Sequence, residues 1–179
     1  MTQVRMDIET IVVGGGPVAS MVVLRPRNPR LTDGNLQLPI QIGLAEASAI
    51  SMGMDDSTNH RPFTHDLLKN VVSELGSTIS SVGIDRVEGA TFFAHVTLIR
   101  SDGEHINVDA RPSDAIALAV RTKAPIFVNS DVLETAAYPD FTTVRKDEEE
   151  RELKEFHDFV ETLSPEDFLI GNNGESQKS

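Results

Sequence analysis

A short pattern occurs twice in the sequence and constrains the fold more than any other feature. In the first copy, residues 38–42 (LPIQI) are followed by the run EASAI, which begins at Glu46. In the second copy, residues 106–110 (INVDA) are followed by the run DAIAL, which begins at Asp114. Each copy has the pattern of a strand, a short loop and a helix that starts with an acid. The sequence therefore predicts a duplicated unit of three strands and two helices.

Alternation and helical periodicity predict the remaining elements. A helix is expected over residues 65–75, with Thr64 as its N-cap and Gly76 at its end. Another begins after Ser113, and it should be buried because its run at 115–120 is apolar on every side. Grouped strands and helices favour an α+β fold, a mixed or antiparallel sheet with helices packed on it. Strands are predicted at 4–14, 18–25, 36–42, 78–87, 91–100, 105–110 and 126–128, and short helices at 44–54 and from 131 onwards.

The glycine-rich stretch IVVGGGPVAS at residues 11–20 has the glycine spacing of a dinucleotide-binding fingerprint. That fingerprint needs a helix directly after the glycines, so that the helix amino end can hold the pyrophosphate. Here the following residues include Val22 and Val23, which favour a strand, and Pro26, which would stop a helix. The stretch is therefore interpreted as a hairpin between two strands.

Composition excludes several classes of function. The 179 residues contain no cysteine, which removes disulfides, thiolate zinc sites and cysteine catalysis. The net charge is −12, and no basic patch of the kind that grips a phosphate backbone is found. No stretch is apolar enough to span a membrane, and the amino end lacks an apolar signal core. A soluble, cytoplasmic protein is expected.

The negative charge is concentrated toward the end of the chain. Residues 146–179 contain four Lys or Arg and eleven Asp or Glu. Within them, Leu153, Phe156, Val160 and Leu163 recur at helical spacing. We expect a main domain over residues 1–140, an acidic amphipathic helical extension over 141–170 that contacts the domain or a protein partner, and a disordered tail over 171–179.

Two further stretches place Arg-Pro, a hydroxyl residue and an acid at the start of a helix. The first runs from Arg61 to Asp66, and the second includes Asp109 and runs from Arg111 to Asp114. In a structural interpretation, Thr64 and Ser113 cap the helices, the acids complement the positive helix ends and the arginines pair with carboxylates.

A catalytic interpretation uses the same side chains differently. Duplication would bring Glu46, Asp66 and Asp114 to related positions, where their carboxylates could hold Mg²⁺ or Mn²⁺. Such an ion can activate water and stabilise charge on phosphorus. His65 is a candidate base or metal ligand. Arg61 and Arg111, with Ser113, are candidates for binding a substrate phosphate.

Taken together, these motifs resemble the bifunctional nuclease domain family, found in bacteria and plants. The resemblance covers roughly residues 4–137, with the motifs in family order, and the acidic extension resembles those of actinobacterial members. The matching segments are Leu38-Pro39-Ile40 with Ile42-Gly43 and Glu46-Ala47, Arg61-Pro62 with Thr64-His65-Asp66-Leu67, the strand Thr91-Phe92-Phe93-Ala94, and the run Asp109-Ala110-Arg111-Pro112-Ser113-Asp114-Ala115-Ile116-Ala117-Leu118.

The resemblance implies an internally duplicated α+β fold, a homodimer and a nuclease acting on DNA and RNA. Activity on both would favour metal-assisted hydrolysis over a mechanism that needs the 2′-hydroxyl group. The predicted catalytic residues are Glu46, His65, Asp66, Asp109, Arg111 and Asp114.

Two other functions stay open from the sequence. One is a non-catalytic, dimeric interaction or regulatory domain, in which the Arg-Pro and Asp motifs are structural ion pairs and helix caps. The other is binding of a small anion at the duplicated helix amino ends.

Overall fold

The computed structural model describes residues 2–14, 19–29, 36–55 and 61–139, and the single residue Lys154. The chain divides into two compact units, Met1–Pro139 and Asp140–Ser179. Apart from Lys154, the predicted helical extension (141–170) and disordered tail (171–179) lie outside the described residues. The fold below is therefore that of the first unit.

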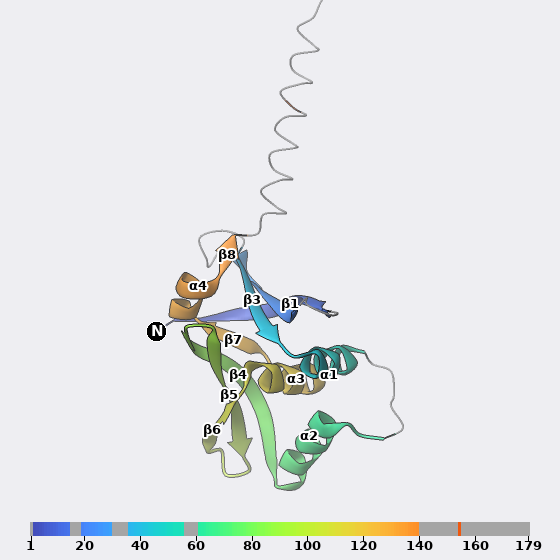
Figure 1. The fold of residues 1–179 in the computed structure, drawn as a ribbon. Coiled ribbons are helices and arrows are strands. Elements are labelled where there is room, and N and C mark those ends of the chain that lie inside the picture. The colour runs from blue at the N-terminus through green and yellow to red at the C-terminus, as the bar shows by residue number, and fades with distance from the viewer. Residues whose placement is uncertain (1, 15–18, 30–35, 56–60, 140–153, 155–179) are drawn as a thin grey trace, which may run out of the picture. The chain divides into compact units, whose positions relative to one another are not determined.

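The first unit contains two similar series of elements (Figure 1). The first series is β1 (Gln3–Val12), β2 (Ser20–Pro26), β3 (Leu36–Ile42), α1 (Leu44–Met54) and α2 (Thr64–Glu74). The second series is β4 (Ser77–Glu88), β5 (Thr91–Arg100), β6 (His105–Ala110), α3 (Pro112–Thr122), β7 (Ile126–Asn129), α4 (Ser130–Ala136) and the short β8 (Tyr138–Pro139). Each series has three strands followed by two helices, with β7 between the helices of the second.

The strands form one sheet in the order β6-β5-β4-β7-β1-β2-β3-β8. β1–β2–β3 and β4–β5–β6 are antiparallel meanders that run outward from β7 in opposite directions. β7 is parallel to β4, with Val82 beside Ile126, and antiparallel to β1, with Val4 beside Val128. The sheet is therefore mixed, and the predicted α+β fold with helices packed on the sheet is confirmed. The matching strand order on both sides of β7 agrees with an internal duplication.

The hairpin interpretation of the glycine-rich stretch is confirmed. β1 and β2 pair as antiparallel neighbours, with Val12 opposite Met21. β2 begins at Ser20, where a dinucleotide-binding protein would have a helix. The Ser20 hydroxyl accepts a hydrogen bond from the Gly14 backbone N–H over 3.0 Å, which holds the end of β1 beside the start of β2.

The core lies between the sheet and α3, which is buried on nearly all sides as its sequence predicts. α3 contacts α1, α2, β4 and β5, and Figure 1 shows α1 and α3 side by side. The largest fully buried side chains are Met6, Leu24, Leu38, Ile40, Ile50, Ile84, Ile116, Val22, Val82, Val128 and Val132. Within the described residues, no helix is long and apolar enough to cross a membrane.

α2 is packed much more loosely than α3. None of its residues is buried, although its apolar positions recur at helical spacing. Leu67, Leu68, Val71 and Leu75 are all exposed. α2 contacts α3 and β4, so its placement relies on few apolar contacts and on the polar contacts described below.

The two predicted hydroxyl caps are wrong. The α2 N-cap is Phe63, and Thr64 is already the first helical residue. There the Asp66 carboxylate accepts a hydrogen bond from the Phe63 backbone N–H over 3.0 Å. In α3, Pro112 takes the first helical position, which suits its fixed φ and missing N–H, so Arg111 becomes the N-cap. Ser113 is therefore inside the helix and buried.

Ile84 gives a direct test of this core. It is fully buried on β4, beside Val128 of β7 and Ala94 of β5. Ile84→Ala should lower the free energy of unfolding by about 2–5 kcal/mol because it leaves a cavity. Leu75→Ala, at a side chain that is 78% exposed, should change it by no more than about 0.5 kcal/mol. Urea denaturation followed by circular dichroism measures both, and equal effects would contradict this core assignment.

Candidate active site

Three of the predicted site acids occupy the same position in three different helices. Glu46, Asp66 and Asp114 are the third residues of α1, α2 and α3, respectively. A carboxylate in the first turn interacts favourably with the positive end of the helix. Glu46 and Asp114 are equivalent in the duplicated unit, whereas Asp66 is on the second helix of the first series. The partners of the three acids differ.

Arg111 joins two of these acids. Its Nε lies 2.8 Å from Asp114 Oδ2 and its second terminal nitrogen 3.2 Å from Asp114 Oδ1, which makes the pair bidentate. Its first terminal nitrogen donates to Glu46 Oε1 over 3.1 Å. The Arg111 side chain is nevertheless 66% exposed, so the guanidinium lies at the surface with the two carboxylates beneath it.

His65 completes the cluster from α2. Its Nε2 lies 3.2 Å from Asp114 Oδ1, and the imidazole is 15% exposed. A tautomer that donates from Nε2 to Asp114 keeps a free lone pair on Nδ1. We call His65, Asp114, Arg111 and Glu46 the rim cluster. It brings together side chains from α1, α2 and the start of α3.

The electrostatics of the rim cluster favour its ionised form. Burial raises the pKa of Asp114, but hydrogen bonds and charge from Arg111 and His65 outweigh it, so the pKa lies below its ordinary value. Hydrogen bonding to Asp114, followed by the charges of Asp114 and Glu46, raises the pKa of Arg111. Arg111 is therefore a permanent cation, and Asp114 stays ionised into acidic solution.

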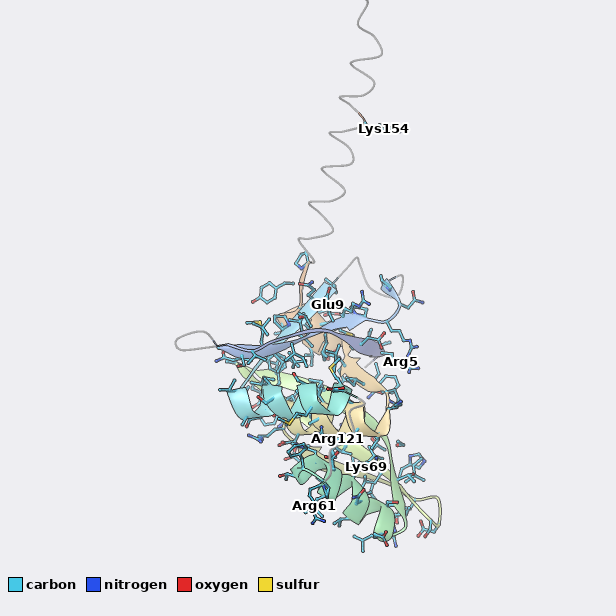
Figure 2. All side chains as sticks on the ribbon, turned by 90° about the vertical axis from the view of Figure 1, so that its right-hand side faces the viewer. Arg5, Glu9, Arg61, Lys69, Arg121 and Lys154 are labelled. Atoms are coloured by element: carbon cyan, nitrogen blue, oxygen red, sulfur yellow. The ribbon has the colours of Figure 1, made fainter. Side chains whose placement is uncertain are left out.

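Asp66 has a different partner. Its Oδ1 accepts a hydrogen bond from Arg121 Nε over 2.8 Å. One terminal nitrogen of Arg121 also donates to the backbone carbonyls of Ala49 and Ala117, over 2.9 and 2.8 Å. Arg121 is only 4% exposed, and it joins α1, α2 and α3 (Figure 2). Asp66 thus serves to attach α2 to the other helices.

Gly53 makes room for Arg121. A Cβ atom at residue 53 would collide with a terminal nitrogen of Arg121 and with the Val120 side chain. A glycine in α1 is unfavourable for helix formation by itself. Its presence here follows from the close approach of the guanidinium.

The rim cluster borders a cavity of about 670 Å³. All four cluster residues line it, together with Arg121. The rest of the lining is mainly aliphatic and comes from α1, α2, α3 and strands β4, β5 and β6. Five of the six predicted catalytic residues therefore line this mainly apolar cavity: Asp109 and the four residues of the rim cluster, which form its polar edge.

Other predicted site residues lie outside this cavity. Arg61 is exposed before α2 and does not line the cavity; Figure 2 shows it away from Arg121. Ser113 is buried and lines a separate cavity of about 480 Å³ between β3 and the start of α3. Asp66 does not line the cavity beside the rim cluster, and its carboxylate is held by Arg121.

Asp109 lines cavities on both faces of the sheet. It lies on β6 between Val108 and Ala110, and all three residues line the cavity beside the rim cluster. Asp109 also neighbours His95 on β5 and lines a polar cavity of about 750 Å³. His95 Nδ1 lies 2.7 Å from Asp85 Oδ2, giving a second imidazole–carboxylate pair that the sequence did not predict.

The predicted metal ligands are engaged with arginines. Glu46 and Asp114 share Arg111, while Asp66 pairs with Arg121. In the part of the chain that the structure describes, no three His, Asp or Glu side chains are placed to hold a metal ion together. A Mg²⁺ or Mn²⁺ site would require Arg111 to leave its two carboxylates, so metal binding stays a prediction.

Comparison with known proteins assigns the family. The model of the bifunctional nuclease domain matches residues 29–140, which is more than half of the chain and includes every residue of the rim cluster. The chain belongs to the bifunctional nuclease domain family. The match confirms the family predicted from the sequence motifs.

Relatives of the family differ in how much of their length this chain covers. An uncharacterised protein of Mycobacterium tuberculosis is 36% identical over 164 residues, 84% of this chain and 95% of the relative. Bifunctional nuclease 1 of Arabidopsis thaliana is 31% identical over 103 residues, 56% of this chain and 32% of the plant protein. Bifunctional nuclease 2 of Oryza sativa subsp. japonica is 31% identical over 114 residues, 62% and 34% of the two chains. The chain thus spans about one third of the plant nucleases.

Sequence reasoning missed Arg121. The signal was its position directly after the apolar run at residues 115–120, in a helix predicted to be buried. A cation in that place needs a buried partner. The sequence alone does not identify that partner. Asp66 is 55 residues away in the sequence, and only the placement of α2 brings it to Arg121.

Replacing Arg121 tests its structural role. Arg121→Met keeps the apolar volume but removes the guanidinium that donates to Asp66 and to the carbonyls of Ala49 and Ala117. The free energy of unfolding should fall by roughly 1–3 kcal/mol. Arg100→Met, which removes a half-exposed arginine paired with Glu104, should cost less than about 1 kcal/mol. Equal losses in urea denaturation would contradict the role of Arg121.

The lowered pKa of Asp114 predicts a specific pH dependence. Because the folded pKa is below the ordinary 3.8, the Asp114 carboxylate stabilises the fold above that value, and this contribution is lost as the pH falls through the folded pKa. Arg111→Gln should raise the pKa of Asp114 toward or above 3.8, whereas Arg100→Gln should leave it unchanged. Carboxyl NMR titration measures the shift, and an unchanged pKa in Arg111→Gln would refute the pairing.

Proposed function

We propose that the chain hydrolyses phosphodiester bonds in DNA and RNA at the rim cluster. The observation that carries this proposal is the arrangement of the rim cluster at the edge of one cavity. His65 and Arg111 both contact Asp114, and Glu46 contacts Arg111. The cluster combines an imidazole held by a carboxylate with an exposed guanidinium. These are the groups needed to accept a proton and to bind a phosphate.

Arg111 is suited to hold the scissile phosphate. Its side chain is largely exposed, and its planar donors match two phosphate oxygens as they match the two oxygens of Asp114. When Arg111 turns toward the phosphate, Asp114 keeps its hydrogen bond to His65. The phosphate would then lie beside the imidazole.

His65 is suited to activate water. Asp114 holds the imidazole through Nε2, so Nδ1 can accept the proton of a water molecule that attacks phosphorus. The P–O bond to the leaving oxygen breaks, and that oxygen takes a proton from solvent. Glu46 holds Arg111 in the substrate-free protein and so keeps the guanidinium near the phosphate site.

The names of the plant relatives agree with this proposal. The proteins from Arabidopsis thaliana and rice are called bifunctional nucleases, and the family model that matches this chain is that of the bifunctional nuclease domain. Since the chain covers about one third of each plant protein, the activity and its DNA and RNA substrates are proposed here.

Metal dependence is part of the proposal's test. If Arg111 moves to the phosphate, Glu46, Asp114 and His65 are the side chains that would hold Mg²⁺ or Mn²⁺. Such an ion would supply positive charge to the phosphate and lower the pKa of a bound water molecule. The acid–base roles above are derived without it.

The decisive experiment measures cleavage of end-labelled DNA and RNA strands in EDTA, Mg²⁺ or Mn²⁺. His65→Ala and Arg111→Gln should each reduce kcat/KM by about 100-fold or more, the usual effect of removing a positioned acid–base group. Arg100→Gln and His105→Ala are matched controls, because neither residue lines the cavity beside the rim cluster. Their rates should equal that of the wild type.

All proteins would be purified identically and shown to be folded by circular dichroism. Equal cleavage by wild type and both rim-cluster variants would place the activity elsewhere or in a contaminant. No cleavage by the wild type in any condition would remove the proposed function. It would favour the alternative of a non-catalytic interaction domain, for which the structural Asp66–Arg121 pair is the specific observation.

Assembly and location stay predictions. A homodimer, a protein partner for the acidic extension and a cytoplasmic location were all expected from the sequence. Light scattering on the full chain would show whether it is a homodimer. It would also show whether the rim-cluster variants alter assembly as well as cleavage.

A further inference from the structure

The apolar walls of the cavity beside the rim cluster call for their own explanation. They come from three helices and three strands, and away from the rim cluster they are mainly aliphatic. At about 670 Å³ the cavity is within the size range of pockets that bind small molecules, roughly 300–1,000 Å³. The apolar lining includes Met52, Leu68, Val96, Leu98, Val108 and Leu118.

The opening of the cavity is also apolar. Phe63 at the start of α2, Met52 on α1 and Val108 on β6 line the cavity and are exposed. Phe63 provides the aromatic ring among the lining residues. Exposed apolar side chains that surround a hollow are typical of a binding site for a flat or apolar group.

The charge of the rim cluster limits how much contacts with the phosphate backbone can contribute to the affinity for a nucleic acid. Arg111 faces two carboxylates, Glu46 and Asp114, so the cluster does not attract a polyanion strongly. The whole chain has a net charge of −12. Affinity from the phosphate backbone grows with the number of cationic contacts, and here that number is small. Binding of a nucleic acid must therefore draw on contacts to another part of the nucleotide.

We propose that the cavity takes one unpaired nucleobase of the strand whose phosphate lies at Arg111. The chain therefore acts on single-stranded nucleic acid and discriminates against duplexes. A base within a duplex is paired and stacked, and it would have to leave the helix to enter the cavity. This inference rests on the proposed function, because the rim cluster supplies the phosphate contact beside the cavity.

The same site accounts for activity on both DNA and RNA. Every base has an apolar face, so contacts with that face tolerate different sequences. An aliphatic wall does not form hydrogen bonds to a 2′-hydroxyl, which is the group that distinguishes RNA from DNA. A base pocket next to a phosphate site thus recognises the feature that the two substrates share.

Binding to a fluorescent strand tests the pocket separately from cleavage. The probe is a single-stranded oligonucleotide that contains 2-aminopurine, compared with the same sequence in a duplex, both in EDTA. The wild type should bind the single strand at least about 10-fold more tightly than the duplex, since one buried base contributes about that factor or more. The 2-aminopurine emission should change on binding.

A cavity-filling variant identifies the site. Ala45→Leu/Val108→Leu adds volume at two lining residues without changing charge. It should weaken single-strand binding about 10-fold and remove the emission change. Val13→Leu, a like substitution at an exposed residue that does not line the cavity, should behave as the wild type. Circular dichroism confirms that each variant is folded.

The outcomes separate the two proposals. Cleavage of duplex and single strand at equal rates, or unchanged binding by the cavity-filling variant, would overturn the base pocket and leave the proposed function intact. Single-strand binding that depends on the cavity, without cleavage in Mg²⁺ or Mn²⁺, would support the pocket and overturn the nuclease. Neither binding nor cleavage by the wild type would overturn both.

Discussion

The arrangement of the candidate site depends on one buried cation. Arg121 is held by the Asp66 carboxylate and by the carbonyl groups of Ala49 and Ala117, so a single guanidinium connects α1, α2 and α3. This matters most for α2, which buries no side chain. Since His65 precedes Asp66, the contact that fixes α2 also fixes the imidazole beside Asp114. A structural ion pair in this protein is thus a condition for the chemistry proposed at the neighbouring residue.

A shared feature of the helix starts explains why acids gather here. Glu46, Asp66 and Asp114 have the same place in the first turn of their helices, where each stabilises the helix amino end. The arginine that each acid contacts then gives it a different role. Asp66 pairs with a buried arginine, whereas Glu46 and Asp114, the two acids that are equivalent in the duplication, share an exposed one. The same stabilising feature has therefore produced one structural acid and two acids at a surface cavity.

Most of the fold could be predicted from the sequence, because the strands alternate clearly and glycine and proline mark their ends. The boundaries of β3 and α1 agree with prediction to the residue. The failures have local causes. The helix predicted to begin after Ser113 as its N-cap begins instead at Pro112, and the Asp66 carboxylate rather than Thr64 caps α2. The site was predicted in part. Glu46, His65, Arg111 and Asp114 form one cluster, and Asp109 lines the same cavity, but Asp66 pairs with Arg121 instead. Arg121 could not be assigned a partner because long-range pairing depends on how helices pack.

The central position of β7 has a consequence for how the protein forms. β1 precedes the other strands of the sheet in the chain, yet its neighbour on one side is β7, with Gln3 opposite Asn129. β1 therefore cannot complete its pairing until most of the sheet has been synthesised. At ~5–20 residues per second, this delay amounts to several seconds or more. Contacts so distant in sequence also slow folding, since a long loop must close before they form. During that interval one edge of β1 is an unpaired template for other chains, and this domain should be especially dependent on protection of its first strand.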